Sequence, residues 1–497
     1  MKQAVVVIHG MGEQIPMETL FSFVDAAWTT DESLVDRGKP DPDTGGRRER
    51  NASWSKPDRR TRNFELRVIT TETGKNRKRT DFYEYYWAHR MVDTTWAHVQ
   101  AWLLELMLRN PFTRVPRGLT GVWLLLWAMA IVALVIAIVQ LRPGGDDSRS
   151  WLGAMLVAVV TAAIGWLSGL LVRYFGDVAR YVKAKPANVA RRQEIRESGV
   201  QLLETLMGVT PGGRRGRSDY DRIVVVGHSL GSIVAYDILS HAFARINDIA
   251  EKPDRLPRDQ PARVRLEAAI RRAAGLRAAA MPTAPEGSAS AAPAAEDEPW
   301  SLEAFQAMQA QAREELNGSG NPWIVSDFVT LGSPLTHAEF LLARDRAHIS
   351  EAKLQRQLPS CPPTLEFDRS TGLHHFTYRP DSVRRIGDPH DPEAPRIPHH
   401  AALFAYTRWS NIHSPHRFIA WGDIISGPLA ALFGLEAKAG TVRGIRDAAV
   451  LPRLDDSGRA VDRRPFFTHT RYWRKDSTAA PLPHHIAELR KVLRLGE

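Results

Sequence analysis

The sequence predicts an α/β fold in which helices flank a mostly parallel central sheet. Three apolar runs carry this prediction, because short runs rich in β-branched residues are typical of strands buried on both faces. These runs are residues 4–8 (AVVVI), 223–226 (IVVV) and 323–332 (WIVSDFVTLG). The second run leads through a glycine-flanked turn into apolar residues at helical spacing, which is the strand-turn-helix order of an α/β protein.

The turn after the second run contains Ser229 between two glycines, in the sequence GHSLG at 227–231. A G-x-S-x-G turn between a strand and a helix presents a serine nucleophile with its hydroxyl exposed. Gly227 and Gly231 suit such a turn because the backbones approach too closely for a Cβ atom. We interpret Ser229 as a nucleophile; the alternative is an ordinary glycine-rich turn with an idle serine.

The first run ends in another glycine turn, His9-Gly10-Met11-Gly12. In serine hydrolases of this architecture, such a turn supplies one backbone N–H to the oxyanion hole, and the residue after the nucleophile supplies the other. We therefore expect Met11 and Leu230 to be the donors, through their backbones, with Gly10 and Gly12 shaping the first turn. The alternative is a glycine turn that only lets the chain leave the sheet.

Three segments resemble the α/β-hydrolase superfamily: VVVIHGMGEQ at 5–14, GHSLGSIVAYDIL at 227–239 and VTLGSPL at 329–335. They are similar in particular to bacterial HG-x-GEQ serine hydrolases of lipase or esterase type. The nucleophile segment with its downstream LGSPL also resembles intracellular phospholipases A1 of the DDHD type. The resemblance covers a small part of the chain, and it implies an α/β-hydrolase fold with a serine, histidine and acid triad.

The triad acid is expected between the nucleophile and the histidine, because α/β-hydrolases have that chain order. Asp423 is the preferred candidate, since it follows a predicted strand at residues 417–422 (RFIAWG). The WSN sequence at 409–411 also resembles the W-x-N element before the acid in related lipases. Asp327 is the second candidate, but it lies within a predicted strand rather than past its end. As an alternative, Asp423 only forms a turn.

The general base is expected to be His469, in the sequence FTHTRYW at 467–473, which resembles the H-x-x-YW setting of the family histidine. His484 and His485 compete, but they fall in the first turn of a helix predicted at 483–495. His228 adjoins the nucleophile in sequence, yet the turn is expected to direct its side chain elsewhere. Ser229, Asp423 and His469 thus form the predicted catalytic set.

Two long segments, 119–141 and 151–172, contain no charged residue. Each exceeds the roughly 20 residues that a helix needs to cross a bilayer. A short polar connection with Pro143-Gly144-Gly145 joins them, so we predict a transmembrane hairpin; a buried helical pair is the alternative. Basic residues flank the hairpin, at 109, 114, 117, 173, 180, 183 and 185. The positive-inside rule then puts the catalytic domain on the cytoplasmic side of the membrane. The resemblance to bacterial hydrolases implies that this is a bacterial inner membrane.

Composition excludes several other classes of protein. The chain has 497 residues and a net charge of +10, but no nucleic-acid-binding motif accompanies this charge. Its single cysteine, Cys361, permits no intrachain disulfide. The pairs His374-His375 and His399-His400 lack the spacing of a metal site, so we expect neither metal nor cofactor. No signal peptide is visible, because a core strand begins within the first residues.

The predicted organisation has a hydrolase domain interrupted twice. Residues 1–110 form its N-terminal part, 119–172 the hairpin, and 186–245 the nucleophile strand, turn and helix. Residues 250–320 are expected to be a helical and low-complexity insertion. Its helical run could touch anionic headgroups, but a solvated helix face is the preferred interpretation. Residues 321–497 form the C-terminal part with the acid and the histidine.

We therefore expect a membrane-anchored serine hydrolase that cleaves carboxylic esters, with lipid-like substrates of the lipase, phospholipase or esterase kind. A thioesterase of soluble acyl substrates is the nearest alternative. A membrane-tethered interaction module that has lost its chemistry is the alternative from another class, since a fold alone does not prove activity. Two spans without an ionisable residue are typical of an anchor and not of a transport pathway. The sequence leaves the oligomeric state open.

Overall fold

The computed structural model covers most of the chain. It describes residues 2–10, 15–60, 65–75, 77–91, 107–112, 115, 120–140, 151, 155, 158–159, 161–162, 165, 178, 181–182, 186–210, 216–250, 259–276, 300–380, 394–416, 421–438, 440–450, 468–474 and 482–496.

The described part of the chain is built around an eight-stranded sheet with the strand order β14-β11-β6-β5-β1-β4-β3-β2. The six strands from β14 to β4 run parallel, and β3 and β2 add an antiparallel edge. The parallel strands are β1 (Lys2–Ile8), β4 (Arg79–Tyr85), β5 (Arg222–His228), β6 (Val325–Leu331), β11 (Arg408–His413) and β14 (Arg446–Ala449). The edge strands are β2 (Ser53–Pro57) and β3 (Arg67–Thr71). The predicted α/β class with a mostly parallel sheet is confirmed.

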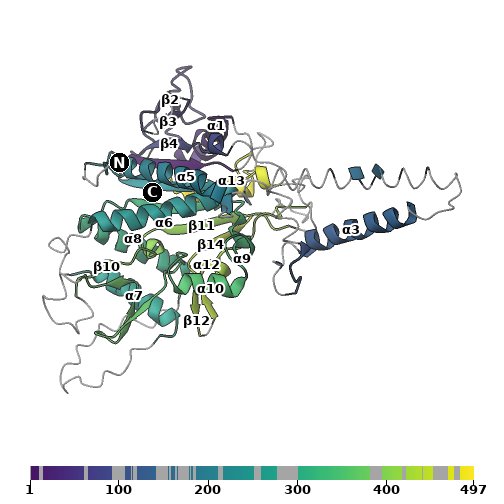
Figure 1. Cartoon of the computed structure of the whole chain (residues 1–497). Helices are drawn as coiled ribbons and strands as arrows, with labels where there is room; N and C mark the ends of the chain where they lie inside the picture. The colour runs from purple at the N-terminus through teal and green to yellow at the C-terminus, as the bar shows by residue number, and fades with distance from the viewer. Residues whose placement is uncertain are drawn as a thin grey trace, which may run out of the picture.

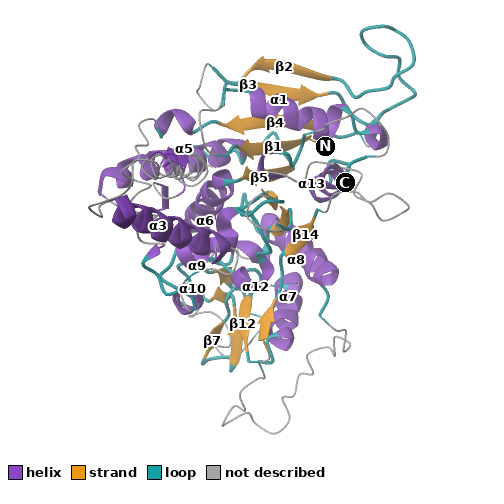
Figure 2. Ribbon diagram, turned by 90° about the vertical axis from the view of Figure 1, so that its right-hand side faces the viewer, coloured by secondary structure: helices purple, strands orange, loops and turns teal. Residues whose placement is uncertain are grey.

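Helices cover both faces of this sheet (Figures 1 and 2). On one face lie α5 (Pro186–Leu206) and α6 (Leu230–Ala250), and on the other lie α1 (Glu18–Val24) and α13 (His484–Leu493). Along β5, Val225 packs with the first group of helices, whereas Val224 and Val226 pack with the second. Alternate side chains of one strand therefore fill two separate cores, which explains the unbroken apolar runs in the sequence.

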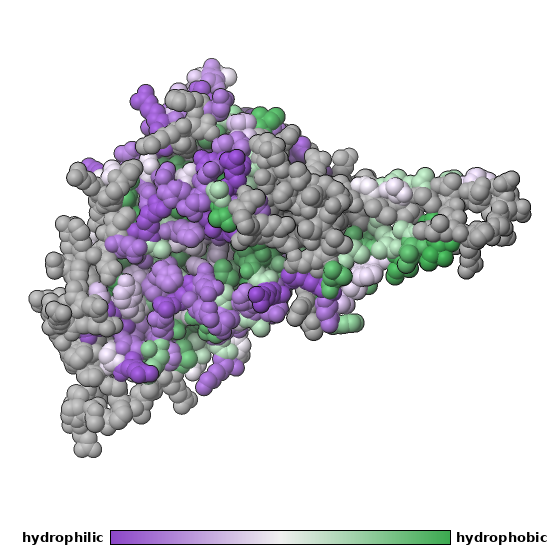
Figure 3. Space-filling model, viewed as in Figure 1, coloured by the Kyte–Doolittle hydropathy of each residue, from purple (hydrophilic) through white to green (hydrophobic). Residues whose placement is uncertain are grey.

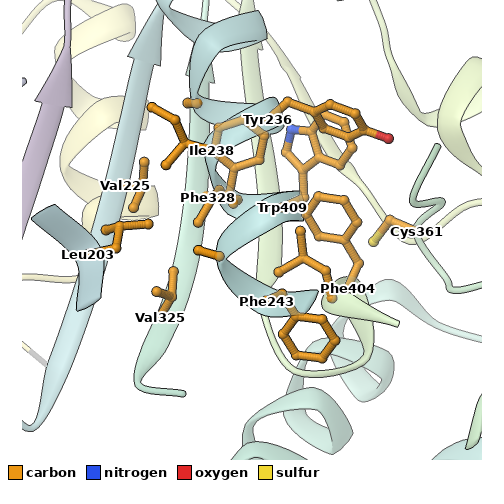
Figure 4. Close-up of a cluster of buried hydrophobic side chains, with 14 of the residues drawn as sticks. Leu203, Val225, Tyr236, Ile238, Phe243, Val325, Phe328, Cys361, Phe404 and Trp409 are labelled. Atoms are coloured by element: carbon orange, nitrogen blue, oxygen red, sulfur yellow. The ribbon is translucent and has the colours of Figure 1, made fainter. Parts of the chain in front are cut away.

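The larger core continues into a lobe beyond α6. Figure 4 shows its aromatic centre, where Tyr236 and Phe243 of α6 meet Phe328 of β6, Phe404 and Trp409. The rings of Phe404 and Trp409 stack with their centroids 4.6 Å apart. The lobe contains α7 (Pro261–Ala273), α8 (Leu302–Gly318), α9 (Ala338–Leu341), α10 (Arg346–Leu354), α12 (Ala430–Phe433), β7 (Glu366–Asp368), β8 (Leu373–His375), β9 (Thr377–Tyr378), β10 (Ile397–Pro398), β12 (Leu435–Ala437) and β13 (Gly440–Val442). Short helical turns complete the described elements: η1 (Asp25–Thr29), η2 (Glu32–Leu34), η3 (Ala88–Arg90), η6 (Pro334–His337), η7 (Leu403–Ala405) and η8 (Thr468–Thr470).

The predicted insertion at 250–320 contains the helix α7, which has exposed residues on one side and a buried side that the sequence did not indicate. Leu266 and Ile270 of α7 are fully buried, and so is the carboxylate of Glu267. Glu267 accepts hydrogen bonds from His375 Nδ1 at 2.8 Å and from Thr377 Oγ1 at 2.7 Å. Arg263 of the same helix forms a buried ion pair with Glu267 at 2.9 Å. The other two partners come from strands about a hundred residues away, so the helix belongs to the core of the lobe.

One long helix, α3 (Thr120–Gln140), projects away from the sheet and its covering helices (Figure 1). It coincides with the first segment of the predicted hairpin, and its visible surface is strongly apolar (Figure 3). The second segment is described only at scattered positions, so the hairpin stays a prediction. Judged over the described residues alone, no helix combines the length and the apolarity that crossing a membrane requires.

The strand predicted at residues 417–422 lies mostly outside the described residues, and Trp421 and Gly422 belong to none of the eight sheet strands. The sheet strand that precedes Asp423 is β11, which contains the WSN sequence at 409–411. The prediction of a core strand that ends directly before Asp423 is therefore wrong at Trp421 and Gly422, the two residues of that segment that the structure describes. Asp423 instead lies in a loop that leads from β11 toward α12.

Candidate active site

The turn after β5 holds Ser229 in a left-handed conformation, with φ 51°. Such a backbone is rare for a residue with a side chain and marks a strained position. The turn also lies against the end of β1: a Cβ atom on Gly231 would fall 2.2 Å from the carbonyl oxygen of Ile8 and 2.3 Å from that of His9. Only glycine fits there, so the sequence GHSLG is what lets the turn pass beside β1.

Three side chains from distant parts of the chain meet at this turn. Ser229 Oγ lies 2.8 Å from His469 Nε2, and both carboxylate oxygens of Asp423 lie 3.0 Å from His469 Nδ1. A carboxylate only accepts hydrogen bonds, so Nδ1 carries the ring proton and Nε2 is left to accept the proton of the serine hydroxyl. The structure brings together all three residues of the predicted catalytic set, and all three are buried.

The carboxylate of Asp423 is held in its charged form. Burial alone would raise its pKa, but the opposite charge available on His469 and hydrogen bonds from His469 and Tyr472 keep the pKa well below its usual range. The backbone N–H of Ile425 donates a further hydrogen bond of 3.0 Å to Oδ1. Asp423 can therefore orient the imidazole and stabilise its protonated form.

His228 supports the loop that carries His469. Its Nε2 lies 2.8 Å from the carbonyl oxygen of His469, and because a carbonyl only accepts, Nε2 is the donor. The ring of Trp473 meets the ring of His228 edge to face, with centroids 4.7 Å apart. Burial lowers the pKa of His228 to about 3, so the ring is neutral near pH 7. The expectation that this side chain is directed away from the serine hydroxyl agrees with these contacts.

The glycine turn after β1 is fixed by an aromatic pair. His9 Nδ1 donates to the carbonyl oxygen of Gly10 at 2.8 Å, and His9 Nε2 accepts from the backbone N–H of Trp87 at 3.2 Å. The two rings stack, 5.3 Å apart and 4° from parallel, and the indole N–H of Trp87 donates to the His9 carbonyl oxygen at 3.1 Å. Trp87 thus holds His9 in place at the start of the turn, a role that the aromatic sequence around it does not reveal.

Of the two residues predicted to donate to the oxyanion, the structure describes Leu230 and not Met11. Leu230 is the first residue of α6 and is buried, so its backbone N–H lies at the positive end of a helix dipole. Gly10 lies directly beside the nucleophile, because a Cβ atom on it would fall 2.9 Å from the Cβ atom of Ser229. Met11 and Gly12 lie outside the described residues.

Gly332, at the end of β6, is a part of the site that motif analysis did not single out. Its φ is +58°, and an added Cβ atom would fall 2.5 Å from the ring of Tyr472 and 3.2 Å from both Asp423 Oδ2 and His469 Nδ1. The space over the hydrogen bond between His469 and Asp423 is therefore available only because residue 332 has no side chain. The LGSPL sequence at 331–335 was a signal in the sequence that this glycine is functional, but it did not indicate that the glycine lies against the acid.

The competing candidates lie elsewhere. Asp327 lies near the amino end of β6, at the opposite end of the sheet from Ser229. Burial would raise its pKa, but ion pairs with Arg222 at 2.7 Å and Arg408 at 2.8 Å hold the pKa well below its usual range. His485 lies in the first turn of α13, where Nε2 donates to the carbonyl oxygen of Arg474 at 3.0 Å.

The histidine pairs form no metal centre in the described part of the chain. Nδ1 of His375 lies 2.8 Å from Glu267, and Nε2 of His399 donates to the carbonyl oxygen of Thr364 at 2.9 Å. Among the described residues, no group of three or more histidine, cysteine or acidic side chains could hold a metal ion.

Comparisons with known proteins identify no protein similar to this chain. No family model matches the chain, and neither a curated protein nor a solved structure matches it. A functional conclusion therefore depends on the residues and their geometry.

Proposed function

We propose that the protein is a serine hydrolase that cleaves carboxylic esters through a covalent acyl-enzyme. One observation carries the proposal: an unbroken hydrogen-bond chain from Ser229 Oγ to His469 Nε2, 2.8 Å, and from His469 Nδ1 to Asp423, 3.0 Å. These are the distances at which a neutral imidazole acts as general base for a serine, with a carboxylate fixing its tautomer. The strained backbone of Ser229 adds support, because such strain concentrates at functional sites.

The mechanism follows from these contacts. Ser229 Oγ attacks the acyl carbonyl carbon while its proton passes to His469 Nε2, and the carbonyl oxygen becomes an oxyanion. The N–H groups of Leu230 and Met11 would stabilise that charge. The C–O bond to the alcohol then breaks, and the alcohol oxygen takes the proton from His469. Water, activated by the same imidazole, cleaves the acyl-enzyme and regenerates Ser229.

We assign the chain to the α/β-hydrolase fold because of the strands that its site residues follow. Ser229 follows β5, Asp423 follows β11 and His469 follows β14, and the three strands lie on the same side of β1. In a parallel sheet the carboxyl ends of the strands share one edge, which is where ligands bind in open α/β sheets. The strand order and the chain order of the triad support the assignment together.

We also propose that segments 119–141 and 151–172 attach the protein to the cytoplasmic face of a membrane and that the substrate is lipid-like. Neither segment contains a charged residue. On α3, the side chains of Leu124, Ile131 and Leu134 are all more than half exposed. Exposed apolar surface of this kind marks a site that a membrane or another protein covers. Extraction of cell membranes at alkaline pH tests the attachment: a chain released without detergent contradicts it.

The activity is tested with the full chain purified in detergent. Hydrolysis of p-nitrophenyl butyrate and of a diacyl phospholipid is measured for the wild type, Ser229→Ala and His469→Asn. Ser240→Ala is the matched control. This serine lies on the same helix as Leu230, but its hydroxyl donates to the backbone carbonyl oxygen of Tyr236 within that helix. We expect loss of activity of at least a thousandfold in the first two variants and none in the control. Equal rates in the wild type and Ser229→Ala would remove Ser229 from the mechanism, and preference for an acyl thioester would favour the thioesterase alternative.

A further inference from the structure

A short segment, residues 107–112, connects the base of α3 to the domain; we call it the junction. The indole N–H groups of Trp123 and Trp127 both donate to the carbonyl oxygen of Met107, at 3.2 and 3.0 Å. On its other side the guanidinium of Arg109 lies 4.4 Å from the ring centroid of Phe340 in α9 and donates to the carbonyl oxygen of Arg344 at 3.3 Å. The junction therefore holds the first turns of α3 against a defined part of the domain.

The junction exposes two large apolar side chains, Leu108 at 79 % and Phe112 at 93 %. Both lie close in sequence to α3, whose own apolar side chains are exposed as well. The backbone N–H of Phe112 donates to Asn110 Oδ1 at 2.9 Å, so the turn that presents the ring is ordered by a local hydrogen bond. Exposed apolar groups next to paired tryptophans are typical of the zone where a protein meets the surface of a bilayer.

The charges around the junction fit the same surface. Arg344 and Arg346 are exposed next to α9, on the side of the domain that Arg109 contacts. Anionic headgroups attract basic residues at this position, at the base of an uncharged helix. Negatively charged lipid is therefore the partner whose chemistry matches both the apolar and the charged groups.

The side of the domain that carries the junction is also the side of the candidate active site. In Figure 1 the amino end of the chain, where β1 begins, lies away from α3. The parallel strands β1 and β5 run from there toward the side from which α3 projects, and Ser229 follows the carboxyl end of β5. After the hairpin segments, the chain returns to the same edge, where the ring of Tyr181 lies 6.5 Å from that of Trp87. Trp87 in turn fixes the turn beside Ser229 through its hydrogen bonds with His9.

We infer that the junction is seated in the headgroup region of an anionic bilayer, with Leu108 and Phe112 at the boundary of the acyl chains, and that the sheet edge carrying Ser229 faces the membrane. The substrate is then an amphiphilic ester that stays in the bilayer, because the ester carbonyls of glycerolipids lie at that same boundary. The inference rests on the proposed function, and it adds the direction of substrate approach and the class of substrate.

Site-specific fluorescence tests the seating. Cys361, the single cysteine, is fully buried, so a cysteine placed on the surface of the full chain can be labelled selectively. Leu108→Cys and Phe112→Cys carry the environment-sensitive dye NBD, and Phe367→Cys is the control, since Phe367 is 47 % exposed on β7. The labelled proteins are reconstituted in phosphatidylcholine–phosphatidylglycerol vesicles that contain brominated lipid. We expect quenching at positions 108 and 112 at least three times that at 367. Equal quenching at the three positions would overturn the inference. So would an NBD signal at position 108 that changes with the number of protein molecules per vesicle and not with brominated lipid, because a second copy of the chain would then cover the surface.

Activity tests the direction of approach. The double variant Leu108→Asp/Phe112→Asp is compared with Phe367→Asp on two substrates, p-nitrophenyl acetate in solution and a phospholipid in vesicles. We expect the double variant to keep its rate on the soluble ester and to lose at least tenfold on vesicles, with Phe367→Asp unchanged on both. Unchanged vesicle hydrolysis in the double variant would overturn the inference. If the wild type shows no Ser229-dependent hydrolysis of either ester, the proposed function fails, and the quenching result still decides the seating.

Discussion

The phenol of Tyr472 donates a 2.7 Å hydrogen bond to Oδ2 of Asp423, the carboxylate that also binds His469. The direction of this bond is fixed because a carboxylate only accepts hydrogen bonds. The backbone N–H of Ser414 donates to that oxygen at 3.1 Å, and Ser426 Oγ lies 2.9 Å from it. With its own proton on Asp423, the phenol oxygen can only accept from Ser426. Tyr472 is thus a fixed donor that positions the acid.

Removing that phenol is expected to weaken catalysis without removing the nucleophile. Tyr472→Phe deletes one hydrogen bond to a buried charge, which costs about 1–3 kcal/mol, so kcat should fall by roughly tenfold to a hundredfold with little change in KM. A hydrogen bond to the charged form lowers a pKa, so the pKa of Asp423 should rise in the variant and kcat should decline earlier as pH falls. The measurement is kcat against pH.

Tyr236→Phe is the matched control for this variant. It also deletes a buried phenol hydrogen bond, to the carbonyl oxygen of Pro359 at 2.7 Å, but it lies on α6 and touches no member of the triad. A loss of kcat in the control as large as in Tyr472→Phe would assign the effect to general stability.

A methyl group at position 332 is expected to disrupt the triad. Gly332→Ala places a Cβ atom 2.5 Å from Tyr472 and 3.2 Å from Asp423 Oδ2 and His469 Nδ1. Contacts that close force the hydrogen-bonded side chains apart, and we expect kcat to fall at least a hundredfold. The variant also places alanine at a positive φ, which costs about 1–2 kcal/mol by itself.

Gly275→Ala separates the two effects. Gly275 has a φ of +65°, close to the +58° of Gly332, but no heavy atom lies within 4 Å of its added Cβ atom. In a urea titration both variants should show the cost of the positive φ, Gly332→Ala should lose further stability through its close contacts, and only Gly332→Ala should lose activity. Normal activity in Gly332→Ala would show that the site tolerates a displaced Tyr472.

The stability of the fold is expected to fall between pH 6.5 and pH 4. Burial is the main cause of lowered pKa values at four histidines: His9, His337 and His399 at about 4, and His228 at about 3. Within this range the four histidines bind protons in the unfolded chain and not in the folded chain, so the stability they contribute is complete above pH 6.5 and is lost as pH falls. Burial raises the pKa of Glu84 to about 7, which acts in the opposite direction and offsets about one of the four. For each histidine, the free energy of unfolding falls by at most about 1.4 kcal/mol per pH unit.

The apparent urea midpoint at pH 7.5 and at pH 5.0 measures this effect. His399→Asn should reduce the difference between the two midpoints, and the exposed His348→Asn should not. Identical midpoints at the two pH values for the wild type would contradict the assignment of these histidines as buried and neutral.

The residues of the candidate site were accessible from sequence because each carries a local signal. Ser229 sits in a motif bounded by a β-branched strand and a helix, and the chain order of α/β-hydrolases left Asp423 and His469 as the best acid and base. The strands β1 and β5 were accessible for the same reason, since each of them contains an uninterrupted run of β-branched and apolar residues, and β6 was accessible because it is rich in valine and aromatic residues.

The features that were missed depend on contacts between distant residues. In β11, Asn411 is fully buried, and its Nδ2 donates to the carbonyl oxygen of Gly427 at 3.0 Å and to Asp447 Oδ1 at 2.7 Å. A buried polar residue breaks the apolar pattern of a strand, so the more apolar run at 417–422 was favoured. The burial of Glu267 in α7 was missed likewise, because two of its partners, His375 and Thr377, come from a distant part of the chain and add to its ion pair with Arg263.

The central claim is that His469 activates the hydroxyl of Ser229. The most direct test is the rate at which a fluorophosphonate modifies the full-length protein, with the labelled residue identified by peptide mass spectrometry. We expect a single modified residue, Ser229, and a rate that falls at least a hundredfold in His469→Asn. A wild-type protein that stays unmodified at Ser229, or one that reacts there no faster than His469→Asn, would contradict the claim.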